Sequence, residues 1–282
     1  MAQNFKDNGQ LLPKELTNAI MLKGYESSVV GRLSTQKLIK FGESTYPIFE
    51  SGAELGLVGE AEEIGTSNVS TRFKTLSPVK LATIITVSRE LAELDPAEIM
   101  THIEADLAAS VAKAYDNLIL GGKAKGVVVA GQDNIMQTTK RLEVVGGDYK
   151  SAIVSAVESV GVDYDPTGIA FDTSLRARLA GVVNETQVGL ADLASPRLQI
   201  AGYTAESART VGANGAKLIV GDWSKVQAGF AEDVRITRST DATIGGVNMF
   251  ANDMVALRVT TRIGGVVLDP NAFAVVEDKV EG

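Results

Sequence analysis

Residues 73–91 read Phe-Lys-Thr-Leu-Ser-Pro-Val-Lys-Leu-Ala-Thr-Ile-Ile-Thr-Val-Ser-Arg-Glu-Leu, and they lead into the strongest helical pattern of the chain. The part from Val79 to Val87 is rich in Leu, Ile, Val and Thr, which is typical of a β-strand. Asp95 and Pro96 then suit the N-cap and the first position of a helix. Apolar residues follow at spacings of three and four up to Gly121 and Gly122, namely Ile99, Ile103, Leu107, Val111, Ala114 and Leu118. This stretch predicts a strand followed by one long helix.

The segment before this strand predicts a long β-hairpin with divided charge. Short β-prone runs at 36–40 and 45–49 are separated from the second β-prone arm by the Gly-rich, acidic stretch 51–65. Every charged residue from Glu43 to Glu63 is a glutamate, and basic residues return only on the second arm. So few large apolar residues give the hairpin no core of its own, and isolated hairpins are marginal in water. We therefore expect it to lie on another surface.

Residues 1–35 predict an arm that contains a marginal helix. Pro13 suits the first turn of this helix. Gly24 and Gly31 weaken it, so we expect it to need a neighbouring surface. The predicted apolar stripe consists of Leu16, Ala19, Ile20, Leu22 and Lys23.

The rest of the chain alternates short helices and strands. A helix is predicted at 149–160, and a strand at 168–171 is followed by Asp172 and Thr173, which suit the cap of a third helix through Leu179. Further β-prone runs lie at 218–220, 229–237, 249–250, 254–262 and 266–268. No internal repeat or low-complexity tract occurs. The layout predicts a mixed α+β fold.

The composition excludes several classes of functional site. The 282 residues include no cysteine and one histidine, which excludes disulfides, thiolate zinc sites, Fe–S clusters, cysteine nucleophiles and metal sites with two imidazoles. His102 has Glu98 and Asp106 four residues away on either side. This pattern is typical of a solvated helix face with weak ion pairs, which we favour over a carboxylate-oriented base or a weak metal site. We predict no metal and no cofactor.

No motif for phosphate binding or nucleophilic catalysis is present. The Gly-rich run 212–217 lacks the G-x-x-x-x-G-K-[ST] spacing, no G-x-G-x-x-G follows a strand, and no G-x-S-x-G occurs. Turn geometry accounts for these glycines. The sequence therefore predicts no catalytic residues and favours a protein that is not an enzyme.

The charge balance argues against a nucleic-acid-binding surface over the whole protein. Lys and Arg number 27 against 35 Asp and Glu, for a net charge of −8, whereas affinity for nucleic acid comes mainly from basic groups on phosphates. Residues 1–7 lack the apolar run of a secretory signal. The longest apolar runs, at 81–87 and 126–131, are far shorter than the roughly 20 residues that span a bilayer. We expect a soluble intracellular protein.

Several segments form an ordered set across residues 30–275. They are Leu57-Val58-Gly59-Glu60, the run from Phe73 to Ala82, Val87-Ser88-Arg89-Glu90-Leu91, Leu218 to Lys225, Ala256-Leu257-Arg258-Val259, and Gly265 to Phe273. In this order they resemble the major capsid proteins of tailed bacteriophages with the HK97 fold. The family's strand motif has two lysines where this sequence has Val79 and Lys80, so only Lys80 matches.

The resemblance implies an α+β capsid subunit of the HK97-like fold with five parts. They are an N-terminal arm (1–35), an extended-loop hairpin (36–88), a peripheral domain with a spine helix (89–124), an axial domain (125–245), and a return to the peripheral domain with the C-terminus (246–282). In such shells the arm and the hairpin lie across neighbouring subunits, so that many modest contacts add up to a stable lattice.

The implied function is structural. The chain would self-assemble, as pentamers and hexamers, into an icosahedral shell that encloses a double-stranded DNA phage genome, after synthesis and assembly in the host bacterial cytoplasm. The implied partners are other copies of the chain, a portal and a separate scaffolding protein or none, with decoration proteins left open and no membrane. The negative net charge suits a container that releases its DNA, so we expect no sequence-specific or tight DNA binding.

The predicted site residues are inter-subunit contacts. Glu60, Glu62 and Glu63 are predicted to meet basic groups of an adjoining subunit, and Arg72, Lys74 and Lys80 to meet its carboxylates, each exposed pair contributing little alone. Some relatives form lysine–asparagine isopeptide crosslinks. Lys74 or Lys80 with Asn248 or Asn252 would be the participants here, but surface lysines and turn asparagines are the interpretation that we favour.

Two alternatives stay open at this stage. An encapsulin-like nanocompartment shares the fold but encloses cargo enzymes. An α/β enzyme acting as a small oligomer would instead have a deep pocket with convergent polar groups.

Overall fold

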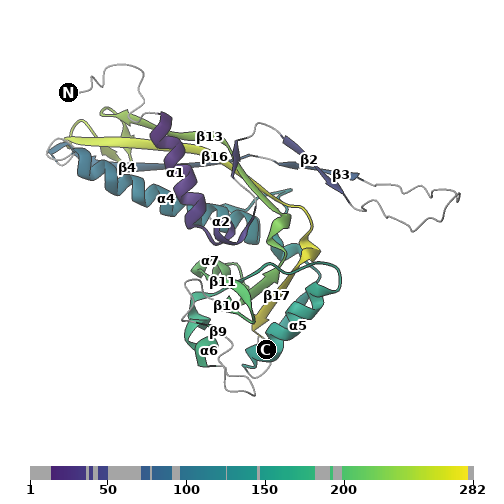
Figure 1. The fold of residues 1–282 in the computed structure, drawn as a ribbon. Coiled ribbons are helices and arrows are strands. Elements are labelled where there is room, and N and C mark those ends of the chain that lie inside the picture. Colours follow the sequence, from purple (N-terminus) through teal and green to yellow (C-terminus); the bar gives the residue numbers. More distant parts are fainter. Residues whose placement is uncertain are drawn as a thin grey trace, which may run out of the picture.

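The computed structural model describes residues 14–35, 38–40, 44–49, 71–76, 78–90, 96–124, 126–144, 147–181, 191–192 and 199–278. Figure 1 shows one sheet with helices at the top, a second sheet with further helices below it, and a thin hairpin that extends sideways. The mixed α+β layout predicted from the sequence is confirmed.

The upper sheet has the strand order β1-β13-β16-β4. Strands β13, β16 and β4 are antiparallel, and β1 runs parallel to β13. The β13–β16 pairing shifts register twice, between Phe230 and Glu232 and between Glu232 and Arg235. The bounds are β1 (Ile39–Lys40), β4 (Val79–Ser88), β13 (Val226–Ser239) and β16 (Met254–Val267).

Helices α1 (Lys14–Ser27) and α4 (Pro96–Gly121) cover one face of this sheet. The long helix was predicted, and its observed start at Pro96 agrees with the role of proline at a first helical position. Alternate residues of β4 face the helices, because successive side chains of a strand point to opposite sides. The inward residues are Val79, Leu81, Ile85 and Val87.

The packing of α1 corrects the predicted apolar stripe. Leu22 is 47% exposed, whereas Met21 and Tyr25 are buried in the main core cluster with Ile20. Gly24 lies where α1 approaches α4, and a Cβ there would come within 2.8 Å of Val111 Cγ1. Close approach of the two helices therefore requires a glycine that the sequence alone marks only as a weak helix former.

The neighbouring surface that this helix was predicted to need is supplied, in the described residues, by its own chain. Helix α1 and the short α2 (Val29–Leu33) pack on α4 and on strands of their own chain. The ring of Tyr25 meets that of Tyr115 edge-on at 5.4 Å. Six apolar residues of the arm are thus buried in the core of their own chain, namely Ile20, Met21, Tyr25, Val29, Val30 and Leu33. Sequence periodicity does not tell whether a helix packs on its own chain or on a neighbouring subunit, since it shows that a face is apolar but not what covers it.

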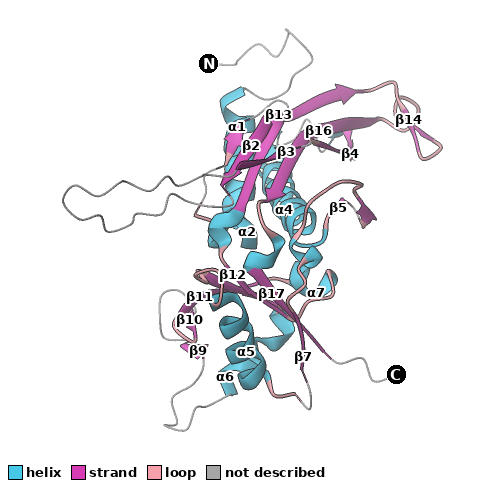
Figure 2. Cartoon of the chain, turned by 90° about the vertical axis from the view of Figure 1, so that its right-hand side faces the viewer, coloured by secondary structure: helices cyan, strands magenta, loops and turns pink. Residues whose placement is uncertain are grey.

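The lower sheet has seven strands in the order β7-β17-β12-β8-β11-β10-β9. Its bounds are β7 (Arg141–Val144), β8 (Gly168–Phe171), β9 (Ala191–Asp192), β10 (Gln199–Ile200), β11 (Tyr203–Ser207), β12 (Leu218–Gly221) and β17 (Phe273–Asp278). Helices α5 (Tyr149–Gly161) and α6 (Arg176–Gly181) pack on one face, which Figure 2 shows below the sheet. The predicted helix at 149–160 and the strands at 168–171 and 218–220 are confirmed.

The two sheets share a core. Leu218 and Val220 of β12 face α5, whereas Ile219 between them belongs to the cluster that also contains Met21 and Val259. Trp223 is fully buried in that cluster, where its Nε1 donates to the Gly168 carbonyl at 3.0 Å and its ring meets Phe273 edge-on.

The remaining elements are short. Three two-stranded hairpins are β2 (Ser44–Phe49) with β3 (Thr71–Leu76), β5 (Lys123–Ala124) with β6 (Val127–Val128), and β14 (Thr243–Ile244) with β15 (Val247–Asn248). Helix α7 (Arg209–Ala213) and the 3₁₀ turns Ile135–Gln137, Thr173–Leu175, Trp223–Lys225 and Pro270–Ala272 complete the description. Asp172 stands before the third of the predicted helices, but its carboxylate accepts from Ser174 Oγ and does not cap the backbone.

Several predicted strands lie elsewhere than expected. Residues 249–250, predicted as β-prone, form a turn after β15, and Met249 is buried there. Strand β4, assigned by sequence to the second arm of the hairpin, pairs with β16, while β3 alone pairs with β2. Pro78 separates β3 from β4 and lacks the backbone N–H that a continuous ladder would use.

The division of the chain into five named parts stays a prediction. The sheets cross two of its boundaries, since β13 lies in the upper sheet although residues 125–245 were assigned to the axial domain. In the same way, β17 lies in the lower sheet although residues 246–282 were assigned to the peripheral domain and the C-terminus.

Candidate functional site

The most prominent surface feature is the hairpin β2–β3. Among the described residues its two strands pair with each other only, in register from Ser44 opposite Leu76 to Phe49 opposite Thr71. The hairpin reaches away from both sheets (Figure 1), and Phe73 on it is 66% exposed. The predicted contact residues Glu60, Glu62 and Glu63 lie outside the described residues. Arg72 lies on β3.

A second feature is a basic face on the upper sheet, on the side opposite α1 and α4. It consists of Lys80, Arg235, Arg258 and Arg262, all of them exposed. Strand register brings them to one side, since Lys80 stands opposite Arg262, and Arg235 stands opposite Thr260, which lies between Arg258 and Arg262. Glu232 neutralises part of this face, with its Oε2 3.4 Å from Arg262 Nε. The predicted contact residue Lys80 is thus one member of a cluster.

Lys74, by contrast, has partners within its own chain. Its Nζ donates to the Val267 carbonyl at 2.8 Å and lies 3.2 Å from Asp133 Oδ2. Its side chain is only 19% exposed. The sequence did not indicate this contact, because Asp133 is 59 positions away and nothing in the local pattern marks it as a partner.

The two asparagines considered for crosslinks have roles in a turn. Asn248 Oδ1 accepts from the backbone N–H of Ala251 at 3.0 Å, and Asn252 Nδ2 donates to the Asn248 carbonyl at 2.8 Å. The interpretation of these residues as turn asparagines is confirmed. Nearby Phe250 is 79% exposed, at the far end of the β13–β16 pair.

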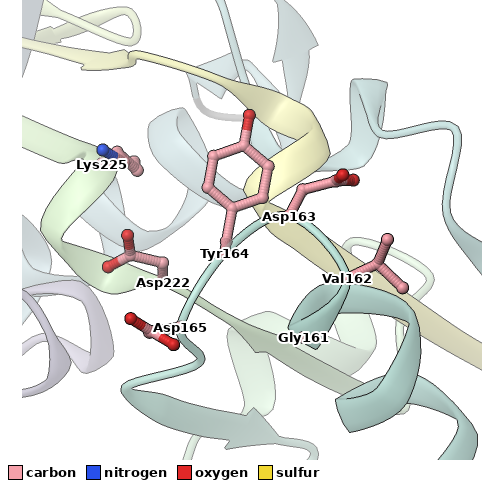
Figure 3. Close-up of a pocket in the computed structure, with 7 residues that line it drawn as sticks. All are labelled: Gly161, Val162, Asp163, Tyr164, Asp165, Asp222 and Lys225. Atoms are coloured by element: carbon pink, nitrogen blue, oxygen red, sulfur yellow. The ribbon is translucent and has the colours of Figure 1, made fainter. Parts of the chain in front are cut away.

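An open hollow of about 390 Å³ lies beside the lower sheet, lined by Gly161, Val162, Asp163, Tyr164, Asp165, Asp222 and Lys225 (Figure 3). Two of its three aspartates have partners in the local structure. Asp222 accepts from the Ser224 backbone N–H at 3.0 Å, and Asp163 lies 3.0 Å from Lys140 Nζ.

The phenol in this hollow is a hydrogen-bond donor. Tyr164 donates its hydroxyl proton to Asp269 Oδ2 at 2.5 Å. Burial, together with this hydrogen bond and the nearby carboxylates, raises the pKa of Tyr164 to about 12, so the phenol stays protonated at neutral pH. The hollow therefore pairs no nucleophile with a base among its described lining residues.

The described residues also bear on the metal and membrane predictions. No group of three or more His, Cys, Asp or Glu side chains among them has the arrangement of a metal site. His102 and Asp106 both lie on the exposed face of α4, as a solvated helix face requires. No described helix is long and apolar enough to cross a bilayer.

A buried carboxyl group that the sequence analysis missed lies where the two sheets meet. Asp116 of α4 is 4% exposed, and its oxygens accept from the Val30 backbone N–H at 3.2 Å and from Thr210 Oγ1 at 3.1 Å. It thereby connects α4 to α2 and to α7. Burial raises the pKa of Asp116 to about 6, against the lowering effect of these hydrogen bonds and of Arg32. The signal that could have found it is a charged residue on the apolar stripe of α4, between Tyr115 and Leu118.

The sequence profile of the phage capsid family matches residues 8–278, nearly the whole chain. The chain belongs to the phage capsid family. Among individual relatives, the major capsid protein of Staphylococcus phage 80alpha is 24% identical over 280 residues, which cover 95% of this chain and 85% of that protein.

Solved structures agree on the fold of this capsid protein. A chain of Mycobacterium phage Ogopogo superposes with a TM-score of 0.69 at 24% identity, covering 89% of this chain and 92% of the other. A chain of Gordonia phage Cozz gives 0.70 at 22% identity, covering 90% and 87%. A third, described as the capsid of an empty GTA particle, gives 0.64 at 14% identity and covers 99% and 94%.

These findings confirm the family proposed from the motifs and the α+β, HK97-like capsid fold. The protein is a structural component of a capsid shell, formed by self-assembly and located in the virion. The nanocompartment alternative is not favoured.

Proposed function

We propose that copies of this capsid protein close, as pentamers and hexamers, into an icosahedral shell around double-stranded DNA. The observation that carries the proposal is the hairpin β2–β3, which forms no sheet with the rest of the described chain and extends away from it. A two-stranded ribbon is marginal in water, so it gains stability from a surface outside its own subunit. Each such contact is modest, and a closed lattice repeats it many times.

The surface proposed to receive the hairpin is the basic face of a neighbouring subunit. The hairpin segment from Glu43 to Glu63 contains six glutamates and no basic residue. The basic face offers four cations, of which Arg262 lies beside the carboxylate of Glu232. We therefore assign Glu60, Glu62 and Glu63 to contacts with this face, with Lys80 as one of its members. Arg72 remains a proposed contact to a neighbour's carboxylate, whereas Lys74 is given a role within its own subunit.

The remaining parts of the proposal concern partners and location. The resemblance to the family supports four further proposals: the five-part division of the chain, a portal, a separate scaffolding protein or none, and assembly in the host cytoplasm. Decoration proteins stay open. We propose no enzymatic activity and no cofactor. With a net charge of −8, subunits are expected to bind duplex DNA weakly. Tight binding with a steep salt dependence would contradict this part.

Negative-stain microscopy of the purified full-length chain, alone and after co-expression with the scaffolding protein if the genome encodes one, tests the proposal directly. Uniform, hollow, closed particles are the expected result. A discrete small oligomer under both conditions would refute it.

A charge-swap series tests the assignment of the contact. The triple variant Glu60→Lys, Glu62→Lys, Glu63→Lys and the double variant Arg258→Glu, Arg262→Glu are each expected to lower the yield of closed shells. Combining them restores opposite charges across the contact and is expected to recover assembly, because an ion pair depends on the product of the two charges.

A matched control separates this contact from a general effect of net charge. Glu26, Glu158 and Asp165 are exposed carboxylates on α1, on α5 and after α5. Their triple replacement by lysine changes the net charge equally and is expected to leave assembly intact. Normal shells from both test variants, or no recovery in the combination, would show that the face is not the receiving surface.

A further inference from the structure

The root of the hairpin β2–β3 is attached to the body by a polar contact. Phe73 and Lys74 are neighbours on β3 and point to opposite sides, as strand geometry requires. Phe73 is 66% exposed and faces away from the body, whereas Lys74 is 19% exposed and faces it. The side chain that this part of the hairpin directs at the body is thus a cation.

The acceptors of Lys74 belong to two different segments. The Val267 carbonyl, 2.8 Å from Nζ, is at the end of β16. The Asp133 carboxylate, 3.2 Å away, belongs to the loop that follows β6. One ammonium group therefore joins three parts of the chain that are distant in sequence, and its three protons allow it to serve both acceptors at once.

The loop that carries Asp133 is itself held firmly. Buried Gln132 donates from Nε2 to the Gly265 carbonyl of β16 at 2.6 Å. Gln137 and Asn134 then donate from their side-chain amides to the Gln132 carbonyl, at 3.3 and 3.2 Å. These hydrogen bonds hold the loop in place, so the Asp133 carboxylate is a fixed acceptor for Lys74.

The position of this contact matters because β16 ends there. After Val267 the chain leaves the upper sheet, passes through Asp269, and enters β17 in the lower sheet. A hairpin attached at Val267 is therefore attached where the two sheets are joined.

We propose that Lys74 is the positioning residue that sets the direction of the hairpin relative to the body, by holding β3 on Val267 and Asp133. Among the described residues the hairpin joins neither sheet. Where β3 approaches β16, Lys74 supplies a hydrogen bond and an ion pair to the body. This role goes beyond the proposed function, because it belongs to the single subunit and is tested without assembly.

The absence of cysteine makes a direct measurement possible. Phe73→Cys on the hairpin and Ser110→Cys on the exposed side of α4 introduce two unique sites for spin labels. The distance distribution between the labels, measured by pulsed electron resonance on the unassembled full-length chain, reports the direction of the hairpin. In this labelled background a single narrow distribution is expected.

Three variants at lysines then test the proposal. Lys74→Met keeps the length of the side chain but removes the charge and the donors, and it is expected to widen the distribution about twofold, as suits a marginal ribbon that has lost its attachment. Lys74→Arg keeps charge and donors and should retain the narrow distribution. Lys80→Met is the matched control on the neighbouring strand, and it too should leave the width unchanged.

An unchanged distribution in Lys74→Met would overturn the proposal, and so would equal widening in Lys80→Met. If Lys74→Met does not fold, as judged by the fluorescence of buried Trp223, then Asp133→Leu takes its place. That variant removes one of the two acceptors and leaves the Val267 carbonyl in place. A wider distribution is again expected, and an unchanged width would overturn the role assigned to Asp133.

Discussion

Replacing Asp116 by asparagine is expected to stabilise the subunit at neutral pH. The folded protein raises the pKa of this carboxyl from 3.8 to about 6. A shift of this size corresponds to about 3 kcal/mol between the two protonation states. Because the folded pKa is the higher one, the folded state binds the proton more tightly than the unfolded state between these values. Stability from this group is therefore present below about pH 4 and is lost as the pH rises through about 6.

Asparagine resembles the protonated carboxyl in shape and in lack of charge. Its Oδ1 can accept from the Val30 N–H, and its Nδ2 can donate to Thr210 Oγ1, so the contacts with Val30 and Thr210 are retained. The variant should consequently unfold with a free energy about 2–3 kcal/mol higher than the wild type at pH 7.5, and with an equal one near pH 4. The nearby ion pair between Arg32 and Glu206, at 2.8 Å, is unchanged by the substitution.

Urea denaturation of the unassembled subunit, followed by the fluorescence of Trp223, measures this effect, since the chain has one tryptophan and it is fully buried. Asp106→Asn is the control, because it makes the same chemical change at an exposed carboxylate on the same helix. The reasoning is refuted if Asp116→Asn is less stable than the wild type at pH 7.5. It is also refuted if the difference between the two stays constant down to pH 4.

Three other substitutions have defined outcomes. Gly24→Val would place its Cβ 2.8 Å from Val111 Cγ1, and overpacking α1 against α4 should lower the free energy of unfolding by about 1–3 kcal/mol. Urea denaturation measures this loss, and an unchanged free energy of unfolding would mean that the two helices can move apart without cost. Trp223→Phe removes the indole N–H that donates to the Gly168 carbonyl and should lower the stability of the subunit by about 1–3 kcal/mol. Thermal unfolding followed by circular dichroism measures this loss, and unchanged stability would contradict the importance of the hydrogen bond. Phe250→Ser at the exposed tip should change subunit stability by less than about 0.5 kcal/mol, and a larger loss in the same experiment would show that the ring is packed.

Much of the fold could be predicted from local patterns. The helix beginning at Pro96, the strand at 79–88 and the helix beginning at Tyr149 all carry periodicity and end signals in their own residues. Motif order also identified the family, because the segments are spread over nearly the whole matched range.

What escaped prediction depends on contacts between distant residues. Lys74 was expected to bind a neighbouring subunit, since nothing near it in sequence shows that Asp133 and Val267 lie beside it. Gly24 counts against a helix locally, yet it is required where α1 crosses α4. Asp116 was overlooked because a single acid on an apolar stripe has no visible partner until α2 and α7 are in place.

The placement of β16 and β17 has a consequence for how the protein is made. Each is an inner strand, β16 between β13 and β4, and β17 between β7 and β12, although both come late in the chain. Because β4 pairs with β16, it can form this pairing during translation only after about 170 further residues have left the ribosome. A product truncated before residue 254 would lack both β16 and β17 and would therefore complete neither sheet.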